Sequence, residues 1–517
     1  MASPGSHTME DIASHYADKI VQDDDHYRKL KKAMQRMRDT PLPVGTACSG
    51  TDGIIKWLEK FNDAMRSLGF LPMVACFFYF AFACESDSET LKFHTDQFGT
   101  FQPLFTDICQ LGNESGAWEH HSAAAMLVPW VALLITGFSC KDVSQQSNYK
   151  RGRSDVIRTG KHSTGATWHG VLRYLANHRP WVCLAENVAG LWSQVDVMRE
   201  QVEALGYQLY TIRLNAEEFC LPQRRVRIYF VIVHSAYVDF PWNSFLHVVE
   251  FLKTPALDIY TILASTSASS GMQGAAPSHV GELGSFDAEE FRSSGARQRQ
   301  HACRKIGEKW FDQHRALFQQ AGLPFVVPTD SELRGCARDG FLALSLRERS
   351  VVEYWTLQGC TQGFLDVSES LERFQHVCRD GISCITTSAV YYNFSSEEKL
   401  DLPALWNLQG LDWNSWDNLN QYSNKLLKNL VGNSFSIPNM AAVVLAALLS
   451  LQWPCSEQEA CQWMTRGIPR GLSATLNAEE SGSPHEGPEV EDDANIVEFR
   501  CSGVAGFEDL ADMANLC

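Results

Sequence analysis

This chain of 517 residues lacks several features, and each absence excludes a class of protein. None of its sixteen cysteines forms a C-x-x-C pair, so the sequence indicates neither a zinc ribbon nor a redox dithiol, and we expect no metal site. So many unpaired thiols suit a reducing compartment. The chain does not start with a basic region followed by an apolar run, and no apolar stretch reaches membrane-spanning length. We therefore expect an intracellular protein that contacts no membrane.

An excess of positive charge is also missing, since the formal net charge is -17. The negative charge is concentrated at one end of the chain. Residues 456–517 carry thirteen acidic and three basic residues, which accounts for ten of the seventeen net negative charges. The remaining chain is only mildly acidic, and local basic patches can still bind an anionic partner. The acidic tail, which also contains Gly, Ser and Pro, is typical of a disordered segment.

What the chain does contain is a series of apolar, strand-like runs that lie next to reactive side chains. One run ends shortly before Cys140, the next ends on Glu186, and a third is preceded by Arg225 and Arg227. The carboxyl ends of strands in a doubly wound parallel sheet face one crevice, so these side chains would meet there. The alternatives are a structural cysteine and a solvated strand end.

The order and spacing of these motifs resemble the C5-cytosine methyltransferase family over roughly residues 44–449. Nine short segments carry the resemblance: TACSGTDG at 46–53, CESD at 84–87, FTDI at 105–108, GFSC at 137–140, ENV at 186–188, QRRVR at 223–227, TT at 386–387, LQG at 408–410 and VGNS at 431–434. The resemblance implies an α/β fold with a doubly wound, mostly parallel sheet (Rossmann-like class I methyltransferase). It also implies a smaller target-recognition domain inserted before the closing motifs.

The resemblance further implies methyl transfer from S-adenosylmethionine to carbon 5 of cytosine in DNA. A Cys140 thiolate that adds to carbon 6 would make carbon 5 nucleophilic, which is covalent catalysis. Glu186 would donate a proton or hydrogen bond to N3, and Arg225 and Arg227 would hold the carbonyl oxygen and neighbouring acidic groups. The pKa of a free cysteine is about 8.5, so Cys140 requires a lowered pKa to form a thiolate at neutral pH. Glu186 requires a raised pKa to keep its proton.

Cofactor binding is assigned to three parts of the chain. The glycine turn after the first strand would let the backbone and the next helix approach S-adenosylmethionine. Acidic residues after the next two strands would accept from the ribose and read the adenine, and a late loop would close over the cofactor. The expected cofactor-binding residues are Ser49, Gly50, Gly53, Glu85, Asp107, Ile108, Asn433 and Ser434.

Three residues depart from the family pattern. Cys48 stands where the family usually has an aromatic residue that stacks on adenine, and Ser139 stands where it has proline. Lys141 replaces the usual glutamine, and an ammonium group close to Cys140 would favour the thiolate. We expect the first two changes to affect efficiency.

A stacked cytosine is out of reach of a buried cysteine, so we expect double-stranded DNA with a flipped base, or an unpaired substrate. Two basic stretches are candidates for binding phosphates: a polar, glycine-containing loop over residues 148–162, and the segment 291–315. A solvated loop and a solvated helix face are the alternatives. The nucleic-acid-binding candidates are Lys150, Arg151, Arg153, Arg297, Arg299, Arg304 and Lys305.

The domain prediction has five parts. They are an N-terminal helical cap (1–42), a cofactor-binding and catalytic core (43–242), a target-recognition region (243–378), a return to the core (379–454) and the acidic tail (455–517). Within these parts, residues 265–285 are rich in Ser, Gly and Ala and predict a flexible loop. Residues 344–355 and 437–451 predict helices.

Two other functions stay open at this point. The first is the same chemistry on RNA, because one branch of the family methylates a transfer RNA cytosine; the Cys-Phe-Thr signature of that branch is absent here. The second is a catalytically silent relative that binds DNA or cofactor and regulates a partner. A nuclear location is expected if the source is eukaryotic.

Overall fold

A nine-stranded sheet with the order β5-β4-β3-β2-β1-β6-β7-β10-β8 forms the centre of the fold. The structure, a computed structural model, describes residues 8–37, 41–70, 77–100, 102–144, 155–236, 238–270, 310–325, 341, 344–371 and 377–451. The sheet strands are β1 (Leu42–Ala47), β2 (Phe78–Cys84), β3 (Leu104–Phe105), β4 (Ala117–Glu119), β5 (Ala124–Met126), β6 (Leu133–Thr136), β7 (Val182–Val188), β8 (Tyr207–Asn215) and β10 (Val226–His234).

The direction of the strands confirms the predicted fold class. Strands β3, β2, β1, β6 and β7 are parallel neighbours, whereas β10 runs antiparallel to both β7 and β8. The chain passes outward from β1 through β2 to β3 and then returns to β6 on the other side of β1. Because this reversal separates the loops that follow β1 and β6, a crevice for ligands is expected between them.

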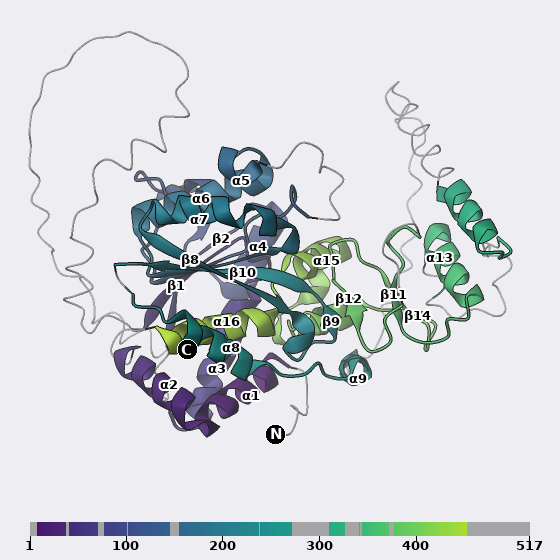
Figure 1. The fold of residues 1–517 in the computed structure, drawn as a ribbon, viewed down its shortest axis with the longest axis horizontal. Helices are drawn as coiled ribbons and strands as arrows, with labels where there is room; N and C mark the ends of the chain where they lie inside the picture. The colour runs from purple at the N-terminus through teal and green to yellow at the C-terminus, as the bar shows by residue number, and fades with distance from the viewer. Residues whose placement is uncertain are drawn as a thin grey trace, which may run out of the picture.

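Helices cover both faces of the sheet (Figure 1). One face carries α5, α6 and α7, and the opposite face carries α8 and α16, with α1 and α2 beyond them. The helices are α1 (Met9–Gln22), α2 (Asp24–Met37), α3 (Gly53–Ser67), α4 (Ser88–Phe98), α5 (Val156–Thr159), α6 (His162–His178), α7 (Val195–Glu203), α8 (Trp242–Leu252), α9 (Ile259–Ser270), α13 (Leu346–Leu357), α14 (Leu402–Leu408), α15 (Asn424–Asn433) and α16 (Ile437–Ser450).

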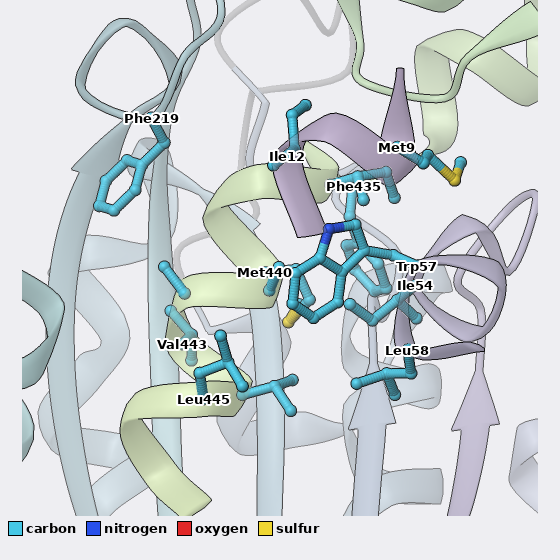
Figure 2. Close-up of a cluster of buried hydrophobic side chains, with 14 of the residues drawn as sticks. Met9, Ile12, Ile54, Trp57, Leu58, Phe219, Phe435, Met440, Val443 and Leu445 are labelled. Atoms are coloured by element: carbon cyan, nitrogen blue, oxygen red, sulfur yellow. The ribbon is translucent and has the colours of Figure 1, made fainter. Parts of the chain in front are cut away.

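Helix α16 forms the centre of the core on its face of the sheet. All of its residues are buried, because it contacts α2, α3 and α8 as well as the sheet side of the core. Pro438 lies in the first turn of the helix. Proline is tolerated there because backbone N–H groups in the first turn have no hydrogen-bond acceptor within the helix. Figure 2 shows side chains of α1, α3 and α16 meeting around Trp57. This packing fixes α3, whose N-terminus follows the glycine turn after β1.

The two N-terminal helices pack on this same core. Thr8 and Asp11 form a capping box at the start of α1, in which each side chain binds the backbone N–H of the other. Met9, Ile12 and Tyr16 of α1 are buried, and α1 packs along α3. The start of the chain therefore supports the helix that leaves the glycine turn.

A smaller lobe lies at one end of the sheet (Figure 1). It contains α13 and a three-stranded sheet with the order β11-β13-β14, formed by β11 (Phe364–Asp366), β13 (Tyr391–Asn393) and β14 (Glu398–Lys399). A separate apolar cluster, which includes Leu344, Val351 and Tyr392, holds the lobe together. The lobe returns to the core through β12 (Ile382–Ser383), which pairs in parallel with β9 (Gln223–Arg224).

The structure confirms the predicted helices near 344–355 and 437–451 and corrects three other expectations. Residues 265–270 are not a loop but the end of α9, because Ile259 and Ile262 bury one face of this helix and the following Ala and Ser residues tolerate helical structure. Residues 156–159 of the expected loop form α5, because Val156 and Ile157 are buried.

The third correction concerns apolar length. Residues Asn424–Ser450, which contain α15 and α16, form a 27-residue stretch that is long and apolar enough to cross a membrane by length and composition. However, 89% of the most apolar window is buried inside the protein, so the described structure accounts for this hydrophobicity as core packing.

Candidate active site

The predicted reactive side chains lie at one edge of the sheet. Cys140 follows β6, and Glu186 lies near the end of its neighbour β7. Because β10 runs antiparallel to β7, the start of β10 lies beside the end of β7, and Arg227 pairs with Val188 in the ladder. The structure therefore brings the thiol, the carboxyl and the arginine segment together.

The loop that carries Cys140 is held by polar contacts. Asn187 Nδ2 donates to the carbonyl of Phe138 at 2.8 Å, which ties this loop to β7. The N–H group of Ser139 donates to Thr167 Oγ1 at 3.1 Å, and the Ser139 hydroxyl accepts from Ser163 at 2.8 Å. A proline at this position has no N–H to donate, so Ser139 gives the loop an anchor on α6 that the usual family residue lacks.

The electrostatic environment of Cys140 differs from the expectation. Burial and the nearby Glu186 raise the pKa of the Cys140 thiol, although Arg227 and Arg225 act in the opposite direction. Lys141 is exposed, and its expected effect on the thiolate stays a prediction. The cations that lower the pKa of Cys140 most belong to the arginine segment.

Glu186 is paired with Arg227. Arg227 Nε lies 2.9 Å from Glu186 Oε1, and both side chains are nearly buried. The two atoms are within ion-pair distance, but their alignment does not make a hydrogen bond, so Glu186 Oε1 keeps acceptor capacity. The carboxyl predicted to act as a proton donor is thus in contact with a guanidinium.

The side chain of Arg225 is held by backbone carbonyls. Its side chain is 3% exposed, and its guanidinium donates at 2.9 Å to the carbonyls of both Ile385 and Ser434. These bonds use the guanidinium to hold two late segments of the chain against the core. Arg225 therefore links two late segments to the core, whereas Arg227 faces Glu186, and the predicted role of Arg225 at the substrate stays a prediction.

The glycine turn after β1 is fixed by a buried acid, Asp52. Asp52 accepts hydrogen bonds from Thr46 Oγ1 at 3.0 Å and from the Ser49 hydroxyl. His94 of α4 bridges the turn, with Nε2 2.8 Å from the carbonyl of Gly50 and Nδ1 3.3 Å from Asp52 Oδ2. His94 could not be predicted from the sequence, because a lone histidine on a helix has no distinctive spacing.

Two acidic side chains lie on the strands beside this turn. Glu85 directly follows β2, and its Oε1 accepts from the Gly50 N–H at 2.9 Å. Burial and the charge of Asp52 raise the pKa of Glu85 to about 8, although the N–H groups of Gly50 and Ser49 lower it. Asp107 follows β3 and accepts from the N–H of Cys109 at 2.8 Å, which begins the short turn containing the buried Ile108.

Ser434 links the turn to the arginine segment. Its Oγ lies 2.9 Å from Thr51 Oγ1, and its carbonyl accepts from Arg225 and from Gln409 Nε2. Gln223 extends this network, since its Nε2 donates to Gln409 Oε1 at 2.9 Å. The neighbouring Asn433 is exposed. The late VGNS motif therefore reaches the glycine turn through Ser434.

The donor set fits S-adenosylmethionine in its chemistry. Gly50 has a φ of +74°, a conformation that glycine adopts readily, and it places no side chain over the backbone of the turn. Gly53 packs so tightly that an added Cβ would lie 2.5 Å from Leu411. Glu85 and Asp107 supply carboxyl oxygens for hydroxyl and amino groups of a nucleoside. The raised pKa of Glu85 indicates that hydrogen bonds within the protein do not fully offset the cost of burying its negative charge.

The predicted nucleic-acid-binding residues lie outside the described residues. This holds for Lys150, Arg151, Arg153, Arg297, Arg299, Arg304 and Lys305, and also for the acidic tail. Their roles stay predictions.

Of the described residues, Cys384 is one that sequence reasoning missed: its sulfur accepts from Arg227 Nη2 at 3.2 Å and from Arg225 Nη1 at 3.4 Å. One cysteine among sixteen gave no pattern that singled it out.

The sheet order gives the protein a Rossmann-like fold, with the predicted reactive side chains at the strand ends. Residues 68–273 match the sequence model of the family described as C-5 cytosine-specific DNA methylase. Over these residues the chain is similar to that family.

Several known proteins are similar to this chain. The DNA (cytosine-5-)-methyltransferase DMT5 of Cryptococcus neoformans is 28% identical over 210 residues, which cover 40% of this chain and 8% of that protein. The type II methyltransferase M.MspI of Moraxella sp is 29% identical over 149 residues, which cover 27% of this chain and 32% of that enzyme. The solved structure of the S. pombe Dnmt2 methyltransferase covers 79% of this chain and 98% of its own at 11% identity, with a TM-score of 0.41. The chain thus spans about a tenth or less of the fungal relatives and about a third of the bacterial ones.

Proposed function

We propose that this protein transfers a methyl group from S-adenosylmethionine to carbon 5 of cytosine in DNA. The observation that carries the proposal is the cluster at the end of β6, β7 and the start of β10, where Cys140, Glu186 and Arg227 lie within electrostatic reach of one another. A nucleophile, a carboxyl and a cation at one strand edge are what addition to a pyrimidine ring requires.

In the proposed reaction the Cys140 sulfur adds to carbon 6 of the base. The raised pKa of its thiol means that few molecules hold a thiolate before the base arrives, so the thiol must lose its proton as the base binds. Glu186 hydrogen bonds to N3 and must take up a proton to donate it, while Arg227 stabilises the negative charge that develops on the ring. After the methyl group has reached carbon 5, water or hydroxide would remove the carbon 5 proton, and the bond between sulfur and carbon 6 would break to release the enzyme.

S-adenosylmethionine supplies the methyl group when bound. Glu85 and Asp107 would accept hydrogen bonds from it, and Ser49, Gly50, Gly53 and Ser434 would form the turn that approaches it. Ile108 would pack beside it, and Asn433 would contact it from the exposed end of α15. His94 and Asp52 hold the turn in shape from behind.

The substrate is proposed to be double-stranded DNA with the cytosine flipped out of the stack. The cysteine is only partly accessible on its loop, and a base within a duplex cannot present carbon 6 to it. The fungal relatives named DNA (cytosine-5-)-methyltransferase support DNA over RNA. Lys150, Arg151, Arg153 and the basic segment around Arg297, Arg299, Arg304 and Lys305 remain the proposed phosphate contacts.

A covalent trap tests this proposal. The protein and Cys140→Ala are each incubated with S-adenosylmethionine and with duplex DNA or transfer RNA that carries 5-fluorocytosine, in which fluorine blocks the final elimination. We expect a denaturation-resistant adduct to DNA that is absent with Cys140→Ala. An adduct to RNA alone would replace the DNA substrate, and no adduct despite intact cofactor binding would indicate a silent regulator.

A further inference from the structure

Cys384 places a second thiol in contact with the arginine segment. It directly follows β12, the strand through which the smaller lobe rejoins the core by pairing with β9. Its sulfur accepts from Arg227 Nη2 at 3.2 Å and from Arg225 Nη1 at 3.4 Å. One sulfur atom therefore joins two guanidinium groups, and it is the lobe that supplies it.

The contact completes the positioning of Arg227. Its Nε faces Glu186 Oε1 at 2.9 Å, its Nη1 donates to the carbonyl of Val226 at 2.9 Å, and its Nη2 donates to Cys384. Each nitrogen of the fork thus has a separate partner. Without the sulfur, Nη2 loses its acceptor, and the planar group can turn about its remaining contacts.

The charges of the cluster also favour this arrangement. Burial opposes the positive charge of Arg227, but Cys384 and, to a smaller degree, Glu186 raise its pKa. Burial likewise opposes ionisation of Cys384, yet Arg227 and Arg225 lower the pKa of this thiol. The pKa of Cys140, in contrast, is raised. The thiol whose pKa is lowered is thus the one that contacts the arginines.

We propose that Cys384 is a positioning residue for the proposed methyl transfer: its sulfur holds the guanidinium of Arg227 against Glu186. The catalytic consequence rests on the proposed function. The link also joins the smaller lobe to the reacting groups, because Cys384 is carried by the strand that leaves the lobe. A shift of β12 against β9 would pass to Arg227 through this sulfur.

The first test compares Cys384→Ala, Cys384→Ser and the control Cys360→Ala. Cys360 is a half-buried thiol of the smaller lobe whose sulfur contacts the carbonyl of Gln362, away from the arginines. Methyl transfer to duplex DNA is measured as kcat and KM, and S-adenosylmethionine binding as Kd. We expect Cys384→Ala to lower kcat about tenfold or more, with little change in the Kd of the cofactor.

The serine variant separates positioning from bulk packing. Its hydroxyl can accept from both arginines, so we expect it to recover a large part of kcat that alanine loses. Wild-type kcat in Cys384→Ala would overturn the proposal. So would an equal loss in both variants that is accompanied by loss of cofactor binding, because that pattern indicates a general structural role.

A second measurement does not depend on activity or on the folding of a cysteine variant. Native protein is labelled with iodoacetamide between pH 6 and pH 9, and the rate at each cysteine is read by mass spectrometry. We expect Cys384 to reach its half-maximal rate at a lower pH than Cys360, and Arg227→Met to move that midpoint upward. Equal midpoints, an unchanged midpoint in Arg227→Met, or no labelling of Cys384 below pH 9 would contradict the contact.

The two measurements also distinguish the proposals. If the wild type methylates neither DNA nor RNA, the proposed function fails, while the labelling profile still reports on the link between Cys384 and Arg227. If the wild type is active and Cys384→Ala is equally active, the positioning role fails and the function stands.

Discussion

Ser434 Oγ lies 2.9 Å from Thr51 Oγ1, although 383 residues separate them in the chain. The Ser434 hydroxyl also accepts from the Thr51 N–H at 3.3 Å, and it donates to the carbonyl of Leu430 at 2.7 Å. The cofactor turn after the first strand is therefore closed by a residue that follows the whole smaller lobe. The site is complete only when the first and last parts of the described fold meet.

Ser434→Ala tests this closure. The variant removes the hydroxyl but keeps the backbone carbonyl that accepts from Arg225 and Gln409, so the fold should persist. We expect a loss of about 1 kcal/mol in the free energy of S-adenosylmethionine binding, measured by calorimetry, because the Thr51 side of the turn loses a buried partner. The exposed Ser388→Ala is the control and should bind as the wild type does. Unchanged binding in Ser434→Ala would mean that the turn holds its shape without this contact.

Gly50→Ala tests the need for glycine in the turn. Gly50 has a φ of +74°, and an added Cβ would lie 3.0 Å from Ser434 Oγ and 3.2 Å from its Cα. We expect cofactor binding to fall at least tenfold, since the methyl group would push Ser434 away and strain the backbone by about 1–2 kcal/mol.

Gly69 provides a matched control for Gly50. Its φ of +76° gives nearly the same backbone strain, but nothing lies within 4 Å of an added Cβ. Gly69→Ala should lower the melting temperature slightly and leave cofactor binding unchanged. If both variants bind the cofactor equally well, steric contact with Ser434 has no role in the site.

Much of this site could be predicted from the sequence, because local patterns specify strands and the residues at their ends. Apolar runs before Cys140 and Glu186 were enough to predict two buried strands that meet at one edge. The partners of Arg225 could not be predicted, since Ile385 and Ser434 accept through backbone carbonyls, which leave no trace in side-chain identity. The same reason hides His94, whose role depends on a turn 44 residues earlier.

Glu85 should make both stability and cofactor binding depend on pH. Its pKa is about 8 in the folded protein, whereas a glutamate in an unfolded chain titrates near 4.5. Between these values the folded state binds more protons at this position, so the contribution of Glu85 to the free energy of unfolding falls as pH rises. Glu85→Gln has no titratable group at this position, so its free energy of unfolding should not fall in this way. Relative to the wild type, the variant should therefore become more stable from pH 5.5 to pH 8.5, as measured by urea unfolding.

Cofactor binding should respond in the opposite direction. A carboxylate accepts stronger hydrogen bonds than a neutral acid, so wild-type affinity for S-adenosylmethionine should rise toward pH 8.5, and the Glu85→Gln variant should bind weakly with a flatter pH profile. Glu119→Gln is the control. Burial opposes its charge, but backbone N–H groups of Ser122, His121 and Leu104 lower the pKa of Glu119 to about 2, so its stabilising effect is constant in this pH range. A parallel pH dependence in wild type and Glu85→Gln would assign the titration to another group.

Arg225 and Arg227 should fail in different ways when they are replaced. Arg225→Met leaves the buried carbonyls of Ile385 and Ser434 without this donor, and we expect the free energy of unfolding to fall by about 3 kcal/mol. Arg227→Met instead leaves Glu186 without its cation at the reacting edge. Because Arg227 is proposed to stabilise charge on the ring, we expect its loss to lower kcat about a hundredfold or more with a smaller loss of stability.

Unfolding in urea and single-turnover methylation, measured on both variants, separate the two roles. Single-turnover rates are taken at a temperature where each variant is folded, so that the stability loss of Arg225→Met does not enter the rate. Under those conditions Arg225→Met should keep most of its activity, since its guanidinium is occupied by backbone carbonyls and a cysteine sulfur. If folded Arg225→Met is as slow as Arg227→Met, Arg225 acts on the substrate. Its contacts to the carbonyls of Ile385 and Ser434 would then be of secondary importance.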